Sequence, residues 1–282
     1  MDFLWISDEM VFFSSLFGPY RENSRSYYRN CTAKIAVSLE RPSEIFLPGK
    51  EVIHFGIALV PPNLLHKVRY SGTGAIVLLV DPSSSQFARI RANLSGGILH
   101  FDAEMFPDLK EKASQIIRGN VDYEIATEFT EDLIESLEDL PGFQTEILPI
   151  DPRIFEIVRY LKNLSDLPSE IDLLHLSKKV GLSPGRFRHL FYENIGISLK
   201  RFLMYLKIRR AADCFASGRN LVQASIMGGF ADAAHFSRSF RLACGQKPSN
   251  ILLSREWERP RILVKNPKET EEDINGIRHS LR

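Results

Sequence analysis

The feature that most constrains the fold of this chain is a pattern that occurs twice, in residues 171–196 and again in residues 221–244. Each copy begins with a short amphipathic stretch, turns at a glycine, and ends in a second stretch whose aromatic residues recur at helical spacing. In the first copy the turn falls at Gly181, after which Ser183 suits an N-cap and Pro184 the first helical position. The pattern predicts two helix-turn-helix units.

The second helix of each unit is predicted to bury an aromatic stripe and to present small and basic side chains on its other face. Phe187 and Phe191 belong to the stripe of the first unit, and Phe236 and Phe240 to that of the second, where Asp232 is the predicted N-cap. The residues predicted to face outward are Gly185, Arg188, His189 and Tyr192 in the first unit and Ala234, Ser237, Arg238 and Arg241 in the second. Small side chains let a helix sit deep in the major groove, and arginine reads guanine edges or holds phosphates. These faces therefore predict a DNA-binding surface.

A linker helix is predicted over residues 198–218, between the two units. About 20 residues of helix span roughly 30 Å, and successive major grooves on one side of a duplex lie roughly 34 Å apart. A single amphipathic helix with outward arginines is more typical of a solvated surface. Two units in tandem at this separation favour DNA binding instead.

Charge is distributed unevenly along the chain, although the formal net charge is only +1. Residues 1–150 hold 13 Lys and Arg residues against 21 Asp and Glu residues, residues 151–261 hold 19 against 10, and the rest of the chain holds 4 against 4. The segment with both predicted units is thus the basic one, which indicates a polyanionic partner, namely double-stranded DNA.

The N-terminal half is predicted to be rich in β-strands. Short β-branched or alternating runs, bounded by Pro, Gly, Asn and Ser, predict strands at 32–40, 43–48, 54–62, 66–72 and 74–82. Such closely spaced strands are typical of an antiparallel barrel or sandwich. The pattern becomes helical over 103–139. We therefore predict an α+β multidomain chain, with domain 1–140, linker 141–151, an all-α domain 152–258 and a disordered tail 259–282.

A second apolar stripe lies in the predicted helix over 121–139. Ile125, Phe129, Leu133 and Leu137 fall on one face, and acidic residues fill the other. We predict that this stripe forms the interface of a homodimer. The alternative, that it packs against its own domain, stays open.

At these residues the chain resembles the AraC/XylS family of bacterial transcription regulators. The segments "GLSPGRFRHLFYENIGIS" and "GGFADAAHFSRSFRLACGQKPS" are similar to the first and second units of that family. The resemblance implies base or phosphate contacts from Gly185, Arg188 and His189, and from Ala233, Ala234 and Arg238. With the outward basic and polar neighbours, the predicted DNA-binding set is Gly185, Arg186, Arg188, His189, Ala233, Ala234, Ser237, Arg238 and Arg241.

The chain departs from the family pattern at a few positions. Ser177 and Ser225 stand where the family usually has alanine in the leading helices, and such changes affect packing. Gly185 has no side chain with which to read a base, so the first unit is expected to act mainly through Arg188 and His189.

The N-terminal half resembles the cupin-like effector and dimerisation domain of the family, on the stretch "ALVPPNLLHKV". His54, His66 and His100 form no His-x-His pair, so we predict no metal and no cofactor. The residues considered as contacts to a small-molecule effector are His66, Tyr70, Arg29 and Trp5. His66 has an alternative role as a turn histidine satisfied by backbone.

The predicted function is a sequence-specific DNA-binding transcriptional regulator, an activator that contacts RNA polymerase and responds to an effector through a cupin-like β-barrel. The alternatives are a cupin-type enzyme fused to a DNA-binding domain and an N-terminal domain that only mediates protein interaction. Three scattered cysteines, Cys31, Cys214 and Cys244, predict reduced thiols in a cytoplasmic protein. The missing His-x-His pair argues against the enzyme alternative, so we predict that the protein is not an enzyme. No run approaches about 18 uninterrupted apolar residues, which argues against a membrane span.

Overall fold

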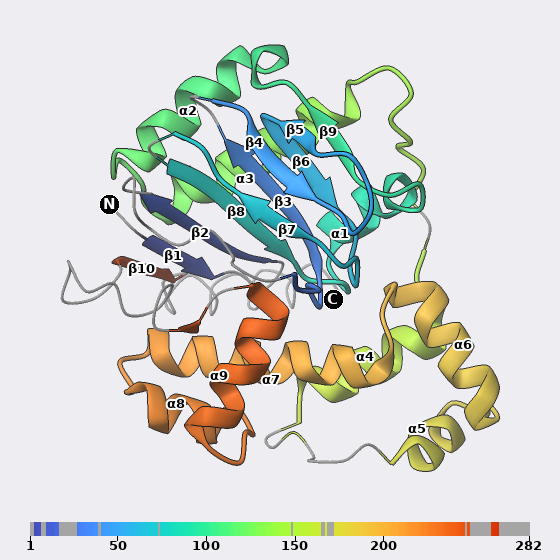
Figure 1. Ribbon diagram of the computed structural model, residues 1–282. Helices are drawn as coiled ribbons and strands as arrows, with labels where there is room; N and C mark the ends of the chain where they lie inside the picture. Colours follow the sequence, from blue (N-terminus) through green and yellow to red (C-terminus); the bar gives the residue numbers. More distant parts are fainter. Residues whose placement is uncertain are drawn as a thin grey trace, which may run out of the picture.

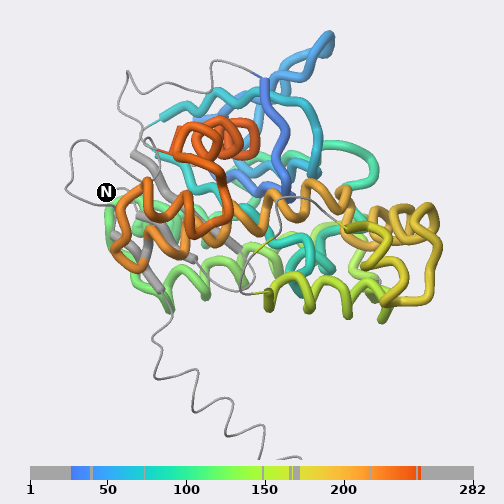
Figure 2. The backbone as a smooth tube through the Cα atoms, turned by 90° about the horizontal axis from the view of Figure 1, so that it is seen from below, coloured from blue at the N-terminus to red at the C-terminus, as the bar shows by residue number. Residues whose placement is uncertain are grey.

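The computed structural model describes residues 3–6, 10–16, 27–38, 41–72, 74–147, 149–164, 167, 172–245, 247–248 and 261–264. A β-rich N-terminal domain and a helical C-terminal domain lie against each other (Figure 1). A view from below shows the last helix, α9, against strands of the N-terminal domain (Figure 2). The predicted division into a β-rich domain and an all-α domain is thereby confirmed.

The N-terminal domain contains two sheets. The larger has the strand order β10-β1-β2-β8-β3-β6-β9, and the smaller has the order β5-β4-β7. Neighbouring strands run antiparallel, except β1 and β10, which are parallel. The strands are β1 (Phe3–Ile6), β2 (Met10–Leu16), β3 (Ala33–Ser38), β4 (Ser43–Phe46), β5 (Ile53–Phe55), β6 (Ile57–Val60), β7 (Lys67–Arg69), β8 (Gly74–Val80), β9 (Leu99–Phe101) and β10 (Arg261–Val264).

Alternation along the central strands divides the interior of the N-terminal domain into separate cores on either side of the larger sheet. In β3, Ile35 and Val37 belong to a core shared with helices, whereas Ala36 belongs to a core shared with the smaller sheet. In β6, Leu59 and Val60 divide in the same way, because successive side chains point to opposite faces. The two sheets share no strand pairing among the described residues, so a closed barrel is not seen. The architecture is the sandwich that the strand spacing also allowed.

The helices of the N-terminal domain cover one face of the larger sheet. They are α1 (Ser85–Ile90), the 3₁₀ helices η1 (Arg91–Leu94) and η2 (Ala103–Met105), α2 (Pro107–Ile117) and α3 (Tyr123–Glu138). Phe129, Leu133 and Leu137 of α3 are at most 1% exposed and pack into the core that includes the larger sheet, whereas Ile125 is 38% exposed. The apolar stripe thus packs against its own domain, and this accounts for three of the four residues predicted to form a dimer interface.

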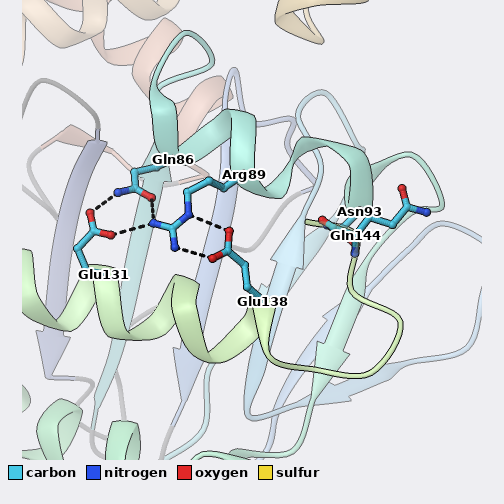
Figure 3. Close-up of polar contacts among 6 residues, drawn as sticks. All are labelled: Gln86, Arg89, Asn93, Glu131, Glu138 and Gln144. Carbon is cyan, nitrogen blue, oxygen red and sulfur yellow. Dashed lines mark hydrogen bonds and ion pairs between the residues drawn. The ribbon is translucent and has the colours of Figure 1, made fainter. Parts of the chain in front are cut away.

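A bifurcated arginine cluster fixes α1 on α3 (Figure 3). Arg89 donates two hydrogen bonds to the Glu138 carboxylate, at 2.8 and 2.6 Å, and one to Glu131 at 2.8 Å. Asn93 of η1 exchanges two hydrogen bonds of 2.8 Å with the backbone of Gln144, at the start of the predicted linker. Paired arginine–carboxylate contacts have a fixed geometry, so they hold α1 on α3, and the Asn93 bonds hold η1 on the segment that follows α3.

The helical domain forms one core. Its helices are α4 (Pro152–Lys162), α5 (Leu173–Lys179), α6 (Pro184–Ile195), α7 (Leu199–Ala216), α8 (Leu221–Met227) and α9 (Ala233–Cys244). Phe187, Phe191, Phe202 and Phe236 are fully buried there. No helix of the described residues is long and apolar enough to cross a bilayer.

The end of the chain differs from the prediction. Residues 261–264 form β10, which pairs in parallel with β1 of the N-terminal sheet. The prediction of a disordered tail over 259–282 is therefore wrong for these four residues, while the rest of that tail lies outside the described residues. The run Ile262, Leu263, Val264 suits a strand, but it is too short to stand out from the sequence alone.

Candidate nucleic-acid interface

The first helix-turn-helix unit consists of α5 and α6. The Asp172 side chain caps α5, and Gly181 takes a φ of +66° in the turn, where a residue with a side chain is strained. Ser183 accepts a hydrogen bond of 3.3 Å from the backbone N–H of Arg186, and Pro184 is the first helical residue. The predicted capping of α6 is confirmed.

The second unit consists of α8 and α9. Asn220 and Gln223 form a capping box at the start of α8, and Gly229 takes a φ of +84° in the turn. Asp232 accepts a hydrogen bond of 2.6 Å from the backbone N–H of His235, which also holds the pKa of that carboxyl below its usual value. A side chain at Gly228 would lie 2.8 Å from the Ala211 Cβ of α7, so this glycine permits close packing of α8 on the linker helix. The second helices, α6 and α9, are called the reading helices below.

Both reading helices bury the predicted stripe and expose the predicted face. Phe187, Phe191, Phe236 and Phe240 are buried. Seven members of the predicted DNA-binding set are exposed and two are half-buried; the exposed ones are Gly185, Arg186, Arg188, His189, Ala234, Arg238 and Arg241, and the half-buried ones are Ala233 and Ser237. All nine thus share the accessible faces of α6 and α9.

The exposed face of α6 borders a hollow that sequence reasoning missed. Arg188 and Tyr192 of α6 line it together with Ser198 and Lys200 at the start of α7. Lys200 is exposed and adds a cation beside Arg188. Beside Arg188, the His189 imidazole lies 3.0 Å from the carboxylate of Glu193. The signal for Lys200 was the basic pair after the predicted start of the linker helix, at Lys200 and Arg201.

The two serines that depart from the family pattern both have hydrogen-bonded hydroxyls. Ser177 and Ser225 are fully buried. Ser177 donates to the carbonyl of Leu174 at 3.1 Å, and Ser225 donates to that of Val222 at 2.7 Å. Bonding to the backbone of the preceding turn satisfies a buried hydroxyl inside a helix.

The residues considered for an effector do not form one exposed site. His66 is fully buried and its Nδ1 lies 2.9 Å from the carbonyl of Leu64, which matches the alternative role of a turn histidine. Arg29 is exposed and donates to the carbonyl of Asn63 at 2.7 Å, and Tyr70 is half-buried beside the core between the sheets. The side chain of Trp5 lies outside the described residues.

Sequence reasoning did not single out Lys34, whose buried amine lies next to His66. Lys34 is 2% exposed; its Nζ lies 2.7 Å from His66 Nε2 and donates to the Tyr28 hydroxyl at 3.0 Å. Burial lowers the pKa of Lys34 to about 7. Burial and the neighbouring Lys34 lower the pKa of His66 to about 2, so its ring is neutral. No group of three or more His, Cys, Asp or Glu suited to a metal occurs in the described ranges of the chain.

The comparisons with known proteins agree with this geometry. Residues 176–253 match the family model described as a helix-turn-helix domain. A region of 112 residues is 31% identical to the arabinose operon regulatory protein of Escherichia coli (strain K12), covering 36% of this chain and 35% of that protein. Residues 176–253 are therefore a helix-turn-helix domain similar to that of the arabinose operon regulatory protein. The same protein of Salmonella typhimurium is also 31% identical over 112 residues. The match spans about a third of the length of these curated relatives.

Solved structures of ToxT from Vibrio cholerae resemble most of the chain, across both domains. One at 1.65 Å resolution has a TM-score of 0.56 at 13% identity and covers 86% of this chain and 97% of that one. A second, bound to an unsaturated fatty acid, has a TM-score of 0.54 at 12% identity and covers 86% and 95%. At this identity the likeness establishes the two-domain fold, with N-terminal sheets followed by tandem helix-turn-helix units.

Proposed function

We propose that the chain is a sequence-specific DNA-binding regulator of transcription. The observation that carries the proposal is the pair of reading helices whose exposed faces bear small and basic residues. The linker helix α7 between the two units has 18 residues, or about 27 Å of helix, which is close to one turn of DNA.

Selection from a random-sequence duplex pool with the full chain tests this function. We expect enrichment of duplexes that carry two short conserved elements about one helical turn apart. Failure to enrich any sequence, with a chain that is folded by circular dichroism, would contradict the proposal.

Regulation is proposed to be activation through contact with RNA polymerase by a homodimer in the cytoplasm. The AraC/XylS family, which the sequence resembles, is rich in activators, and this supports activation over repression. Transcription in vitro from a promoter that carries the selected site measures the direction. Equal transcript levels with and without the protein would contradict activation.

The N-terminal domain is proposed to bind a fatty-acid-like effector through its carboxylate at Lys34. A buried amine with two neutral partners, Tyr28 and His66, lacks the counterion that a buried ammonium requires, and a carboxylate would supply it. The ToxT structure with a bound unsaturated fatty acid supports this chemical class. Tyr28 lies against both Lys34 and His66, and an entering carboxylate would displace it.

Thermal unfolding with a long-chain unsaturated fatty acid tests the effector proposal. We expect the acid to raise the Tm of the wild-type chain and of the exposed control Lys50→Met, but not that of Lys34→Met. An equal rise in all three would place the acid elsewhere.

A change in pH gives a test of the buried amine that needs no ligand. Between pH 7 and pH 10.5 the unfolded chain binds a proton at Lys34 that the folded chain does not, so stability rises with pH. The rise is at most about 1.4 kcal/mol per pH unit. We expect urea unfolding of the wild type from pH 7 to 8.5 to show this slope and Lys34→Met to lose it. Burial raises the pKa of the Cys31 thiol to about 11, so above about pH 8 the unfolded chain begins to lose a proton that the folded chain keeps, and this opposes the rise in both proteins. The difference in slope between the wild type and Lys34→Met therefore isolates the contribution of Lys34.

A further inference from the structure

The N-terminal domain contacts both reading helices at the same place, their last turn. The last carbonyls of a helix have no partner within the helix and must be satisfied from outside. In α6, the guanidinium of Arg91 donates to the carbonyl of Asn194. In α9, the Asn30 side chain donates to the carbonyl of Ala243 at 2.9 Å, and the backbone N–H of Arg29 donates to that of Leu242 at 3.4 Å.

The capping glycines that follow these helices also touch the N-terminal domain. Gly196 and Gly245 take φ values of +75° and +78° at the ends of α6 and α9. A Cβ at Gly245 would lie 2.5 Å from the Tyr28 ring, and one at Gly196 would lie 3.4 Å from the Phe87 ring. A side chain at Gly245 would collide with the Tyr28 ring, whereas a Cβ at Gly196 would be in ordinary van der Waals contact with the Phe87 ring. The end of each reading helix therefore lies against an aromatic ring of the N-terminal domain.

These two contacts come from elements that are themselves firmly held. Arg91 begins η1 directly after α1, which the arginine cluster fixes on α3 (Figure 3). On the other side, Asn30 is 1% exposed, and its Oδ1 has no hydrogen-bond partner among the described residues. Leaving a buried oxygen without a hydrogen bond costs free energy. The hydrogen bond that the Asn30 side-chain nitrogen donates to the end of α9 explains why an amide occupies this position.

We infer that Arg91 and Asn30 are positioning residues through which the N-terminal domain sets the spacing of DNA elements that the two reading helices recognise. This inference rests on the proposed function. Figure 1 shows α6 and α9 with their C-terminal ends toward the sheets. Their N-terminal ends, which carry Gly185 and Ala234, are left to face a duplex. Two helices that are both held at their C-terminal ends cannot change position independently of each other. Only one separation and one relative rotation of the two DNA elements therefore fits both helices.

The test compares affinities for duplexes that differ only in spacing. The probe is a duplex enriched by the wild-type chain from a random pool, remade with one to three base pairs added or removed between its two conserved elements. We expect Arg91→Ala to reduce the affinity ratio between the best and worst spacing by about tenfold, the worth of one charge-assisted hydrogen bond. Asn30→Ala is expected to reduce it in the same direction, and Arg91→Lys, which keeps a donor, to restore it.

Arg118→Ala is the matched control, because this exposed arginine follows α2 in the same domain. A spacing ratio that stays at the wild-type value in folded Arg91→Ala or folded Asn30→Ala overturns the inference, as does an equal gain in affinity at every spacing, which would make the contacts inhibitory. If Arg91→Ala does not fold, Asn30→Ala decides alone. Failure of the wild type to enrich any duplex refutes the proposed function itself, and is thereby distinguished from failure of the inference.

Discussion

Replacement of Arg238 by alanine is expected to weaken binding of the selected duplex by about 1–3 kcal/mol, with most of the loss at one base pair. Arg238 is exposed on α9, one helical turn after Ala234, so a helix that enters the major groove brings both to the base edges. A guanidinium that pairs with a guanine discriminates against the other bases, whereas a phosphate contact does not. Competition with single-base variants of the duplex separates the two roles.

The control for this prediction is Arg118→Ala, which removes one positive charge from the N-terminal domain. If Arg238→Ala loses the same affinity for every sequence and its salt slope falls by about 1, Arg238 is a phosphate anchor. A wild-type affinity in Arg238→Ala would show that this side chain makes no contact that stabilises the complex.

Local features of the reading helices were predictable from the sequence because they depend on neighbours within one turn of helix. The N-caps Ser183 and Asp232, the turns at Gly181 and Gly229, and the aromatic stripes all follow from spacing alone. The reading faces follow too, since the residues opposite a buried stripe are exposed.

Contacts between the two halves were not predictable from local pattern. Arg91 meets Asn194 across 103 residues of sequence, and Asn30 meets Ala243 across 213. Likewise, the apolar stripe of α3 that contains Leu133 needs an apolar surface to pack against. The sequence does not reveal whether the sheet of the same domain or a second chain provides that surface. Lys34 shares a face of β3 with Ala36 and Ser38, which alternation alone would assign to solvent, yet the structure buries it, so neither its burial nor its partners followed from the pattern.

A second charged contact joins the halves and bears on whether they can be separated. Asp81, which follows β8 and is 2% exposed, accepts a hydrogen bond of 2.9 Å from the Tyr205 hydroxyl of α7. Its carboxylate also lies 2.9 Å from the Lys162 amine at the end of α4. Cys31 is the one described residue of the N-terminal half in the helical core, whose other buried members all follow residue 150. The helical domain thus keeps its own core when cut from the rest.

A fragment of residues 151–258 is expected to fold alone as a helical domain and to bind DNA, though less stably than the full chain. It ends before β10, because that strand belongs to the N-terminal sheet. Removal of the N-terminal domain breaks the hydrogen bond from the Tyr205 hydroxyl to the Asp81 carboxylate, and a hydrogen bond to a charged group contributes about 1.5–3 kcal/mol to stability. Circular dichroism of the fragment measures its helical content, and urea unfolding measures its stability relative to the full chain.

DNA binding by this fragment is expected to depend steeply on salt. The fragment carries 17 Lys and Arg residues against 10 Asp and Glu residues, and neutralised phosphates release counterions. With six or more phosphate contacts, affinity falls about 10³-fold between 50 and 200 mM salt. Residues 1–150, which are acidic, are expected to bind no DNA under the same conditions. Gel-shift titrations of both fragments at the two salt concentrations give the comparison.

A folded fragment that binds no DNA has two explanations, which a fusion separates. Either the DNA-reading elements are not in residues 172–245, or a monomer binds too weakly without the effective concentration that a tethered second copy supplies. Fusion to an unrelated dimerising coiled coil restores tethering without the N-terminal domain. If the fused fragment still fails on duplexes that the full chain binds, the assignment of both reading helices to DNA is refuted.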